Sequence, residues 1–255
     1  MFQKLRQNQF LFEELVKRDF TKKYKRTILG MAWSIISPLV NLLIMWLVFS
    51  NLLGSNVDHY VIYLFSGQLV FAYFSDATNL GMTSLVSNSS IFTKINIPKY
   101  FFLLSQNVSA FINFALTLVI YFAFVAAEGL DFTWKFFLLI FPIVSLVIFN
   151  IGLGLILSAL FVFFRDMQYL WGIFTQLIMW LSAIFYTIDS FSDMMKNMFL
   201  LNPLYLFIRY FRKIVIESSV PSPQFHLLMF GYAAIALLAG ALIYKKYNTE
   251  FLYYV

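Results

Sequence analysis

Long, unbroken runs of apolar residues dominate the hydrophobic pattern of this chain. Each run covers about 18–25 residues and does not alternate strictly with polar positions, which is typical of membrane-spanning helices and not of barrel strands. Lipid offers no partners for free backbone N–H and C=O groups, so each run is expected to be a helix. The pattern predicts six spans, at residues 31–53, 60–82, 101–127, 136–164, 170–188 and 226–244.

Two shorter apolar patterns separate the fifth and sixth predicted spans. They cover residues 194–201 and 204–216, on either side of Asn202-Pro203. Neither pattern is long enough to cross a bilayer, so re-entrant or interfacial helices are expected here.

Residues 9–27, ahead of the first span, form an amphipathic pattern. Charged side chains cover most of the helix circumference, and apolar side chains recur on one face. The apolar face comprises Phe12, Leu15, Val16, Phe20 and Tyr24. The pattern predicts a helix on the membrane surface; a solvated charged face with ordinary lipid anchoring would account for it equally well.

Together these elements predict an all-α integral membrane protein with a single domain over residues 1–255. Residues 1–30 would form a cytoplasmic interface helix, and residues 31–188 the first five spans. Residues 189–223 would hold outer re-entrant helices, and residues 224–255 the last span and a cytoplasmic tail. No internal repeat or low-complexity linker interrupts this arrangement.

Composition agrees with lipid as the main solvent of the chain. Hydrophobic residues make up 61% of the sequence and charged residues 12%, against about 25% charged residues in soluble proteins. The net charge of +6 comes from basic residues beside the predicted spans, which indicates topology and anionic lipid, not nucleic acid. Lys and Arg concentrate on the side of the N-terminus, so we expect a multi-pass protein of the bacterial plasma membrane with both termini in the cytoplasm.

Motifs for catalysis are missing from the sequence. The chain has no cysteine, no glycine-rich phosphate loop, no His-Glu-x-x-His and no Gly-x-Ser-x-Gly. Its two histidines, His59 and His226, lie far apart in the sequence, so no metal site is expected. We therefore expect no catalytic residue, metal or cofactor in this chain, and any work against a gradient would draw on a partner or an ion.

Asp76 is an ionisable residue within the second predicted span. Gln68, Ser75 and Asn79 accompany it at helical spacing. Ionisable groups in membranes usually face a cavity or a partner, and a polar packing seam between helices is the alternative.

The fourth predicted span carries small residues and ends in a charged pair. Gly152, Gly154 and Ser158 would allow another helix to approach closely. Arg165-Asp166 closes the span, either by pairing with other loops or by ending the helix among lipid headgroups.

The loop between the second and third spans contains a short helical pattern. Ser or Asn can cap a helix here, and Pro98 would end it. An exposed Phe92 and Lys94 would offer a docking point for a soluble partner, and a simple capped turn is the alternative.

Aromatic residues make up 20% of the chain, and many fit interfacial belts. An aromatic-lined conduit would suit sugars, whose C–H faces stack on rings while their hydroxyls stay hydrated. Ordinary lipid contact or packing is the alternative. The candidate lining residues are Trp33, Trp46, Phe49, Trp171, Phe174, Trp180, Phe185 and Tyr186.

An ordered set of short motifs resembles the permease subunits of polysaccharide ABC exporters. These type-two ABC permeases move O-antigens, teichoic acids and rhamnose-rich wall glycans. The set comprises Arg18-Asp19-Phe20, Lys23-Tyr24-Lys25, Leu29-Gly30-Met31-Ala32-Trp33-Ser34, Pro38-Leu39, Phe74-Ser75-Asp76-Ala77, Ile95-Asn96-Ile97-Pro98-Lys99, Phe164-Arg165-Asp166 and Asn202-Pro203-Leu204. Each motif alone is weak, whereas the ordered set spans almost the whole chain and is specific. Asp76 stands where Glu is frequent in that family.

The resemblance implies partners and roles that the residue pattern does not. It implies a homodimer that pairs with two copies of a cytoplasmic ABC ATPase, which binds the ATP and Mg. A polyprenyl-linked glycan would pass through a channel between the two copies, lined by spans one and five, with a lateral gate for the lipid anchor. The residues that couple to the ATPase would be Phe20, Lys23, Tyr24, Phe92, Thr93 and Lys94.

Two other functions fit the same sequence. One is a permease of the same fold for drugs or small lipids. The other is a membrane-embedded transferase acting on lipid-linked sugar, which would need acids or histidines clustered at a membrane face. Asp189 and Asp193 are the close pair of acids on the outer side, and they read as loop residues.

Overall fold

The computed structural model describes residues 2–24, 27–53, 57–94 and 97–254, and these residues form helices and no strand. The expected all-helical class is therefore confirmed. The longer helices are α1 (Phe2–Tyr24), α2 (Trp33–Leu53), α3 (Tyr60–Ser87), α5 (Tyr100–Ala127), α6 (Ile140–Phe163), α7 (Met167–Leu181) and α10 (Pro223–Tyr247). The shorter elements are η1 (Gly30–Ala32), α4 (Ser89–Phe92), η3 (Trp134–Leu139), α8 (Asp193–Phe199), α9 (Pro203–Val215) and α11 (Phe251–Tyr254).

Three helical segments within the described residues are long and apolar enough to cross a membrane. They are Tyr100–Ala127, Trp134–Phe163 and Pro223–Tyr247. The first predicted span corresponds to α2, which contains a shorter apolar stretch, Trp33–Phe49. The second and fifth predicted spans correspond to α3 and α7. The chain is thus a membrane protein with several apolar helices, and the count of six crossings stays a prediction.

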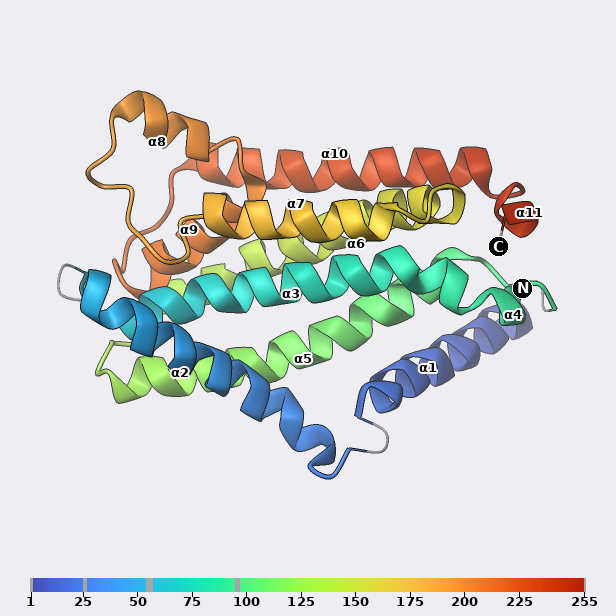
Figure 1. The fold of residues 1–255 in the computed structure, drawn as a ribbon, viewed down its shortest axis with the longest axis horizontal. Coiled ribbons are helices and arrows are strands. Elements are labelled where there is room, and N and C mark those ends of the chain that lie inside the picture. The colour runs from blue at the N-terminus through green and yellow to red at the C-terminus, as the bar shows by residue number, and fades with distance from the viewer. Residues whose placement is uncertain (1, 25–26, 54–56, 95–96, 255) are drawn as a thin grey trace.

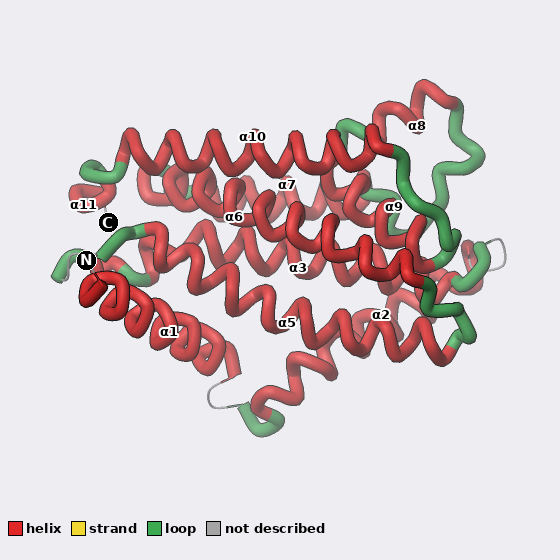
Figure 2. The backbone as a smooth tube through the Cα atoms, turned by 180° about the vertical axis from the view of Figure 1, so that it is seen from behind, coloured by secondary structure: helices red, strands yellow, loops and turns green. Residues whose placement is uncertain are grey.

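The helices form one bundle with two distinct ends (Figure 1). Helix α3 lies at its centre against α5 and α6, and α10 packs along α6. Helix α1 packs on α5, whereas α2 crosses the bundle at an angle. The first turn of α1, α4 and α11 lie at one end, and α8 and α9 lie at the other (Figures 1 and 2). We call these the α4 end and the α8 end.

The contact between α6 and α10 depends on two glycines. A Cβ atom on Gly152 would lie 2.4 Å from the backbone of Ala236 and Leu237, and one on Gly240 would lie 2.6 Å from the Gly152 carbonyl oxygen. The two backbones therefore touch, as small residues allow in membranes. Gly154 also lies close to Gly81 of α3: a Cβ atom on Gly81 would lie 3.2 Å from the Cα atom of Gly154.

Ser158 completes this tightly packed face of α6. Its Oγ lies 2.8 Å from the hydroxyl of Tyr244 on α10. The sequence-based prediction that Gly152, Gly154 and Ser158 permit close helix approach is confirmed.

We expect Gly152→Ala to separate α6 from α10 and to destabilise the protein. Overpacking typically costs about 1–3 kcal/mol, which exceeds the gain of about 1 kcal/mol that alanine brings to a helix interior. Thermal unfolding in detergent micelles would show a lower Tm. Gly231→Ala on α10 is the matched control, because a Cβ there would meet nothing within 4 Å; equal Tm values for the two variants would contradict the close contact.

Candidate functional site

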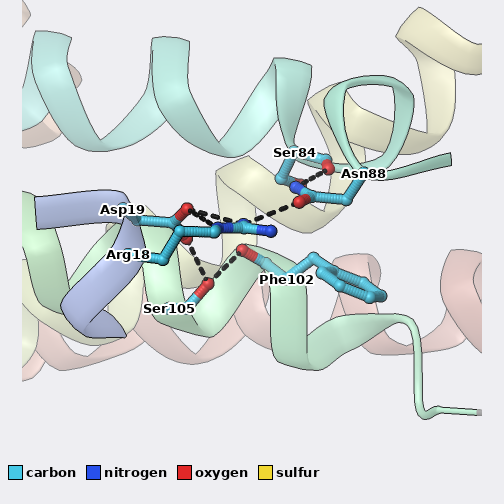
Figure 3. A network of polar contacts seen from close by, with 6 residues as sticks. All are labelled: Arg18, Asp19, Ser84, Asn88, Phe102 and Ser105. Carbon is cyan, nitrogen blue, oxygen red and sulfur yellow. Dashed lines mark hydrogen bonds and ion pairs between the residues drawn. The ribbon is translucent and has the colours of Figure 1, made fainter. Parts of the chain in front are cut away.

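A partly buried ion pair fastens α1 to the bundle near the α4 end (Figure 3). The Arg18 guanidinium donates to Oδ1 of Asp19, at 2.6 Å from Nη2, and also donates to Oδ1 of Asn88 at 2.7 Å. The other oxygen of Asp19 accepts from the Ser105 hydroxyl at 2.8 Å. Asp19 itself is buried. One carboxylate thus joins α1 to α5, and its arginine joins both to the end of α3.

Asn88 has a role in this network that differs from the expected helix cap. It precedes α4, but its side chain makes no capping hydrogen bond. Instead Nδ2 donates to the Ser84 carbonyl at 2.7 Å, which leaves Oδ1 facing Arg18. The turn between α3 and α4 is therefore held by α1, because Asn88 links the two.

The apolar face of α1 packs against protein. Leu15 is buried, and the ring of Phe12 lies edge-on to that of Phe101, with centroids 5.9 Å apart. Phe20 is half-buried. Lys23 and Tyr24 end the helix, but their side chains lie outside the described residues.

The α4 segment presents polar residues and hides its aromatic one. Phe92 is buried against Phe102, with ring centroids 5.9 Å apart. The prediction of an exposed Phe92 is wrong because this ring fills a small core between α4 and α5. Thr93 and Lys94 are exposed, as expected. A partner that docks here would meet these two side chains.

Lys99 ties the α4 end to the last helix. Its ammonium group is largely buried, donates to the Asn248 carbonyl, and lies 5.7 Å from the centroid of the Phe251 ring. Burial lowers the pKa of this amino group. Lys99 therefore packs within the protein instead of facing anionic lipid.

The α8 end contains a non-helical segment that follows α7. Helix α7 ends at Leu181, earlier than the predicted boundary at residue 188. Hydroxyl groups of α3 donate hydrogen bonds to backbone carbonyls of this segment, in place of the N–H groups of a continued helix. The Phe185 carbonyl accepts from the Tyr60 hydroxyl at 3.0 Å, and the Tyr186 carbonyl accepts from the Tyr63 hydroxyl at 2.6 Å.

Arg212 of α9 donates to two further carbonyls of the turn. The guanidinium donates to the Ala183 carbonyl at 2.8 Å and to the Ile184 carbonyl at 3.1 Å. It also donates to the Tyr63 carbonyl at 3.1 Å, and its Cζ lies 3.4 Å from the centroid of the Tyr63 ring. The single clue available in the sequence was a cation on an otherwise apolar helix face.

Asn202-Pro203 forms the junction between α8 and α9. The Asn202 side chain accepts from the Leu204 N–H at 3.0 Å, which caps α9, and Pro203 occupies the first turn. The same amide donates to the Leu181 carbonyl at 3.1 Å and to the Ser182 hydroxyl at 2.9 Å. The motif therefore connects the end of α7 to the start of α9. The two short helices predicted here are confirmed at 193–199 and 203–215, whereas their re-entrant placement stays a prediction.

The aromatic candidates for a channel lining fall into two groups. Trp171 and Phe185 are buried within the chain. The Trp171 Nε1 donates to Thr78 at 3.2 Å, and Phe185 stacks on Phe49 at 4.7 Å. The prediction that Trp171 and Phe185 line a path between two copies is therefore wrong for this conformation, because both rings fill the core.

The other group keeps exposed surface on α2 and α7. It comprises Trp33, Trp46, Phe174 and Trp180, each between 43% and 49% exposed. Phe49 and Tyr186 are half-buried, and the Tyr186 hydroxyl donates to the Trp180 carbonyl at 2.8 Å. These residues remain candidates for contact with a cargo or a second copy.

Two hollows adjoin these helices. An apolar groove of about 590 Å³ at the α8 end is lined by Phe174, Tyr186, Met198 and their neighbours on α7 and α8. A cavity of about 690 Å³ lies between α2, α3 and α5, level with the middle of α3 and α5. Asp76 lines this second cavity, which favours the cavity interpretation of that residue over a packing seam.

The polar neighbours of Asp76 divide between the cavity and the helix. Gln68 and Ser75 line the cavity with it. Asn79 instead donates to the Ser75 carbonyl of its own helix at 2.8 Å. Asn79 is not among the residues that line the cavity.

Arg165 and Asp166 mark the sharp turn between α6 and α7. Both side chains are exposed, and the guanidinium of Arg165 lies 5.3 Å from the centroid of the Phe161 ring.

The two histidines lie apart, and each contacts a different residue. His59 contacts Glu128 at 2.9 Å, and His226 contacts Tyr210 at 2.9 Å. No cluster of three potential metal ligands occurs in the part of the chain that the structure describes.

Comparison with known proteins gives a consistent result. The model of a family described as ABC-2 type transporter matches residues 11–216. The O-antigen export system permease protein RfbA of Myxococcus xanthus is 25% identical over 98% of this chain and 97% of its own length. The capsule polysaccharide export inner-membrane protein CtrC of Neisseria meningitidis is 20% identical over 92% and 89%. The polysialic acid transport protein KpsM of Escherichia coli is 20% identical over 91% and 92%.

We expect Asp19→Ala to loosen α1. The substitution leaves Arg18 without its carboxylate, and losing a buried hydrogen-bonding partner costs about 1–3 kcal/mol. Hydrogen exchange of the α1 amides should accelerate by about tenfold or more. Glu13→Ala, at an exposed position of the same helix, should leave the exchange rates unchanged. Equal rates in both variants would mean that the network does not hold α1.

We expect Arg212→Met to destabilise the α8 end. It removes several hydrogen bonds from a charged donor, each worth about 1.5–3 kcal/mol, so a total loss of about 3 kcal/mol or more should appear as a lower Tm. Arg209→Met is the control, because its ion pair with Glu217 is partly exposed and such pairs contribute about 0–1 kcal/mol. A similar Tm for the two variants would show that Arg212 is not needed for the turn.

Proposed function

Because this chain belongs to the ABC-2 type transporter family, we propose that it is the channel-forming permease subunit of an ATP-driven exporter of lipid-linked polysaccharide. The names of the relatives support this cargo, since they refer to O-antigen, capsule polysaccharide and polysialic acid. Those relatives align over most of this chain and of their own lengths. The names favour an O-antigen or a capsular glycan over teichoic acid.

The observation that carries the proposal is the fastening of α1 to α3, α4 and α5. These four elements are joined by hydrogen bonds among Arg18, Asp19, Asn88 and Ser105, so they would move together. A soluble ATPase that pushes on Thr93 and Lys94 would therefore move the ends of two bundle helices together with α1. A loosely attached α4 would absorb the same push without moving the bundle.

The mechanism we propose uses two copies of this chain and two copies of a cytoplasmic ABC ATPase. Nucleotide binding favours one relative placement of the ATPases, and the permeases follow according to the differential affinity for the two states. The glycan would leave between the two copies, past the exposed aromatic side chains of α2 and α7. Both termini would lie in the cytoplasm, on the side of the α4 end, as the distribution of Lys and Arg indicates.

We expect depletion of this protein in its native cell to trap a polyprenyl-linked glycan inside and to remove the same glycan from the surface. Lipid extraction with sugar analysis would measure the first effect, and surface labelling the second. Restoring expression with the Glu13→Ala variant should recover export, whereas the Asp19→Ala variant should not, provided that membrane fractions contain equal amounts of both.

An unchanged surface glycan without internal accumulation would contradict the polysaccharide cargo. Altered drug tolerance in the same cells would then identify a permease for drugs or small lipids. Accumulation of an unmodified lipid-linked sugar precursor instead of a finished glycan would point to a transferase.

A further inference from the structure

The cavity between α2, α3 and α5 lies within a single copy of the chain. Several of its lining residues, among them Trp33, Asn41 and Ala72, are also exposed on the surface of that copy. Its lining combines hydroxyl and amide groups with aromatic rings. We propose that it binds one neutral, hydroxyl-rich sugar unit of the cargo, an inference that rests on the proposed function.

The polar lining supplies both donors and acceptors from three helices. Hydroxyl and amide side chains can each serve in both roles, as can the hydroxyls of a sugar. The polar lining residues are Thr27, Ser34, Ser37 and Asn41 ahead of or on α2, Gln68, Ser75 and Asp76 on α3, and Asn113 and Thr117 on α5. Such a density of polar groups is costly among membrane helices, which usually marks a site of function.

Gln68 brings an unsatisfied acceptor to the wall of the cavity. Its Oε1 atom is buried and has no hydrogen-bond partner. Leaving a buried acceptor unsatisfied costs about 1–3 kcal/mol, and buried polar atoms normally have partners. Because this oxygen has almost no accessible surface, the Gln68 side chain would have to rotate towards the cavity before a sugar hydroxyl could donate to it.

Aromatic rings form the apolar part of the lining. Trp33 belongs to α2, Phe71 and Tyr73 belong to α3, and Phe114 belongs to α5. Trp33 is exposed and Phe71 is half-buried, so these two rings can offer apolar faces to the C–H side of a sugar, whereas Tyr73 and Phe114 are buried. A pocket of about 300–1,000 Å³ is typical for small molecules. The observed volume of about 690 Å³ falls within that range.

The lining suits a neutral sugar better than an anion or a lipid tail. The described residues that line it include the carboxylate of Asp76 and no Lys or Arg, whereas phosphate groups are normally held by cations. A lipid tail would match the groove at the α8 end, where Phe174, Leu177 and Met198 are among an almost wholly apolar lining.

Cysteine labelling can test this site, because the chain contains no cysteine of its own. We would place single cysteines by Gln68→Cys and Asn113→Cys, with Val119→Cys as the control. Val119 lies on α5 as Asn113 does, but it is 68% exposed on the outside of the bundle. A charged methanethiosulfonate reagent is the probe. It would be applied to membranes that contain the whole transporter, from cells that make the glycan and from cells whose glycan synthesis is blocked.

We expect the two cavity cysteines to react and the control to stay unmodified. The rate of labelling in the cavity should fall by about tenfold when the glycan is present, and a tenfold change corresponds to a free energy of about 1.4 kcal/mol. Equal rates with and without glycan would overturn the proposal. Slow labelling in both kinds of cell would also overturn it, because the cavity would then be closed to the reagent or filled by something other than the glycan.

A filled cavity offers a second test. Ala72 lines the cavity, so Ala72→Trp should occupy the sugar position and reduce export by about tenfold or more, or about 1.4 kcal/mol. Ala126→Trp, at an exposed position of α5, should export normally. Normal export by both variants would contradict the cavity proposal. The proposed function would still stand in that case if depletion trapped the glycan. Depletion that traps no glycan would instead remove the proposed function.

Discussion

The carbonyl groups that are freed where α7 stops are the constraint on which the α8 end depends. The turn is buried from Ser182 to Phe185, and buried backbone carbonyl groups need hydrogen-bond donors. Arg212, Tyr60, Tyr63 and Asn202 provide those donors. This requirement explains why α9 packs deep in the bundle and why a guanidinium is buried without lying in an ion pair among the described residues. Its partners are backbone dipoles, which a planar donor with several N–H groups can reach simultaneously.

The two ends of the bundle use an arginine for different purposes. Arg212 fixes a turn of irregular backbone, and its loss would leave acceptors bare. Arg18 joins separate helices through side chains, and Asp19 keeps its charge compensated. The first arrangement stiffens one place in the chain, whereas the second makes several elements move together. A transporter needs both, because a push at one end is useful only if the other end keeps its shape.

Much of the fold follows from the sequence because apolar length and helical period are strong signals in a membrane protein. The helix positions and the short elements around Asn202-Pro203 were predictable for this reason. The early end of α7 was not, since apolar residues continue past Leu181 and only distant donors stabilise the turn. The burial of Phe92 was also hidden, because its partner Phe102 belongs to the next helix. Asp76 was identified by its cost in lipid, whereas Gln68 needed the three-dimensional arrangement to show its unsatisfied atom.

The glycine contact between α6 and α10 has a consequence for motion. Two backbones that touch at Gly152 and Gly240 interlock, so these helices cannot slide along one another without separating. The two helices would therefore move as one rigid pair. Helix α2 exposes apolar side chains along most of its length, and it would be the element that swings against this pair. In a working cycle the displacement would then be concentrated at α2, beside the cavity that it helps to enclose.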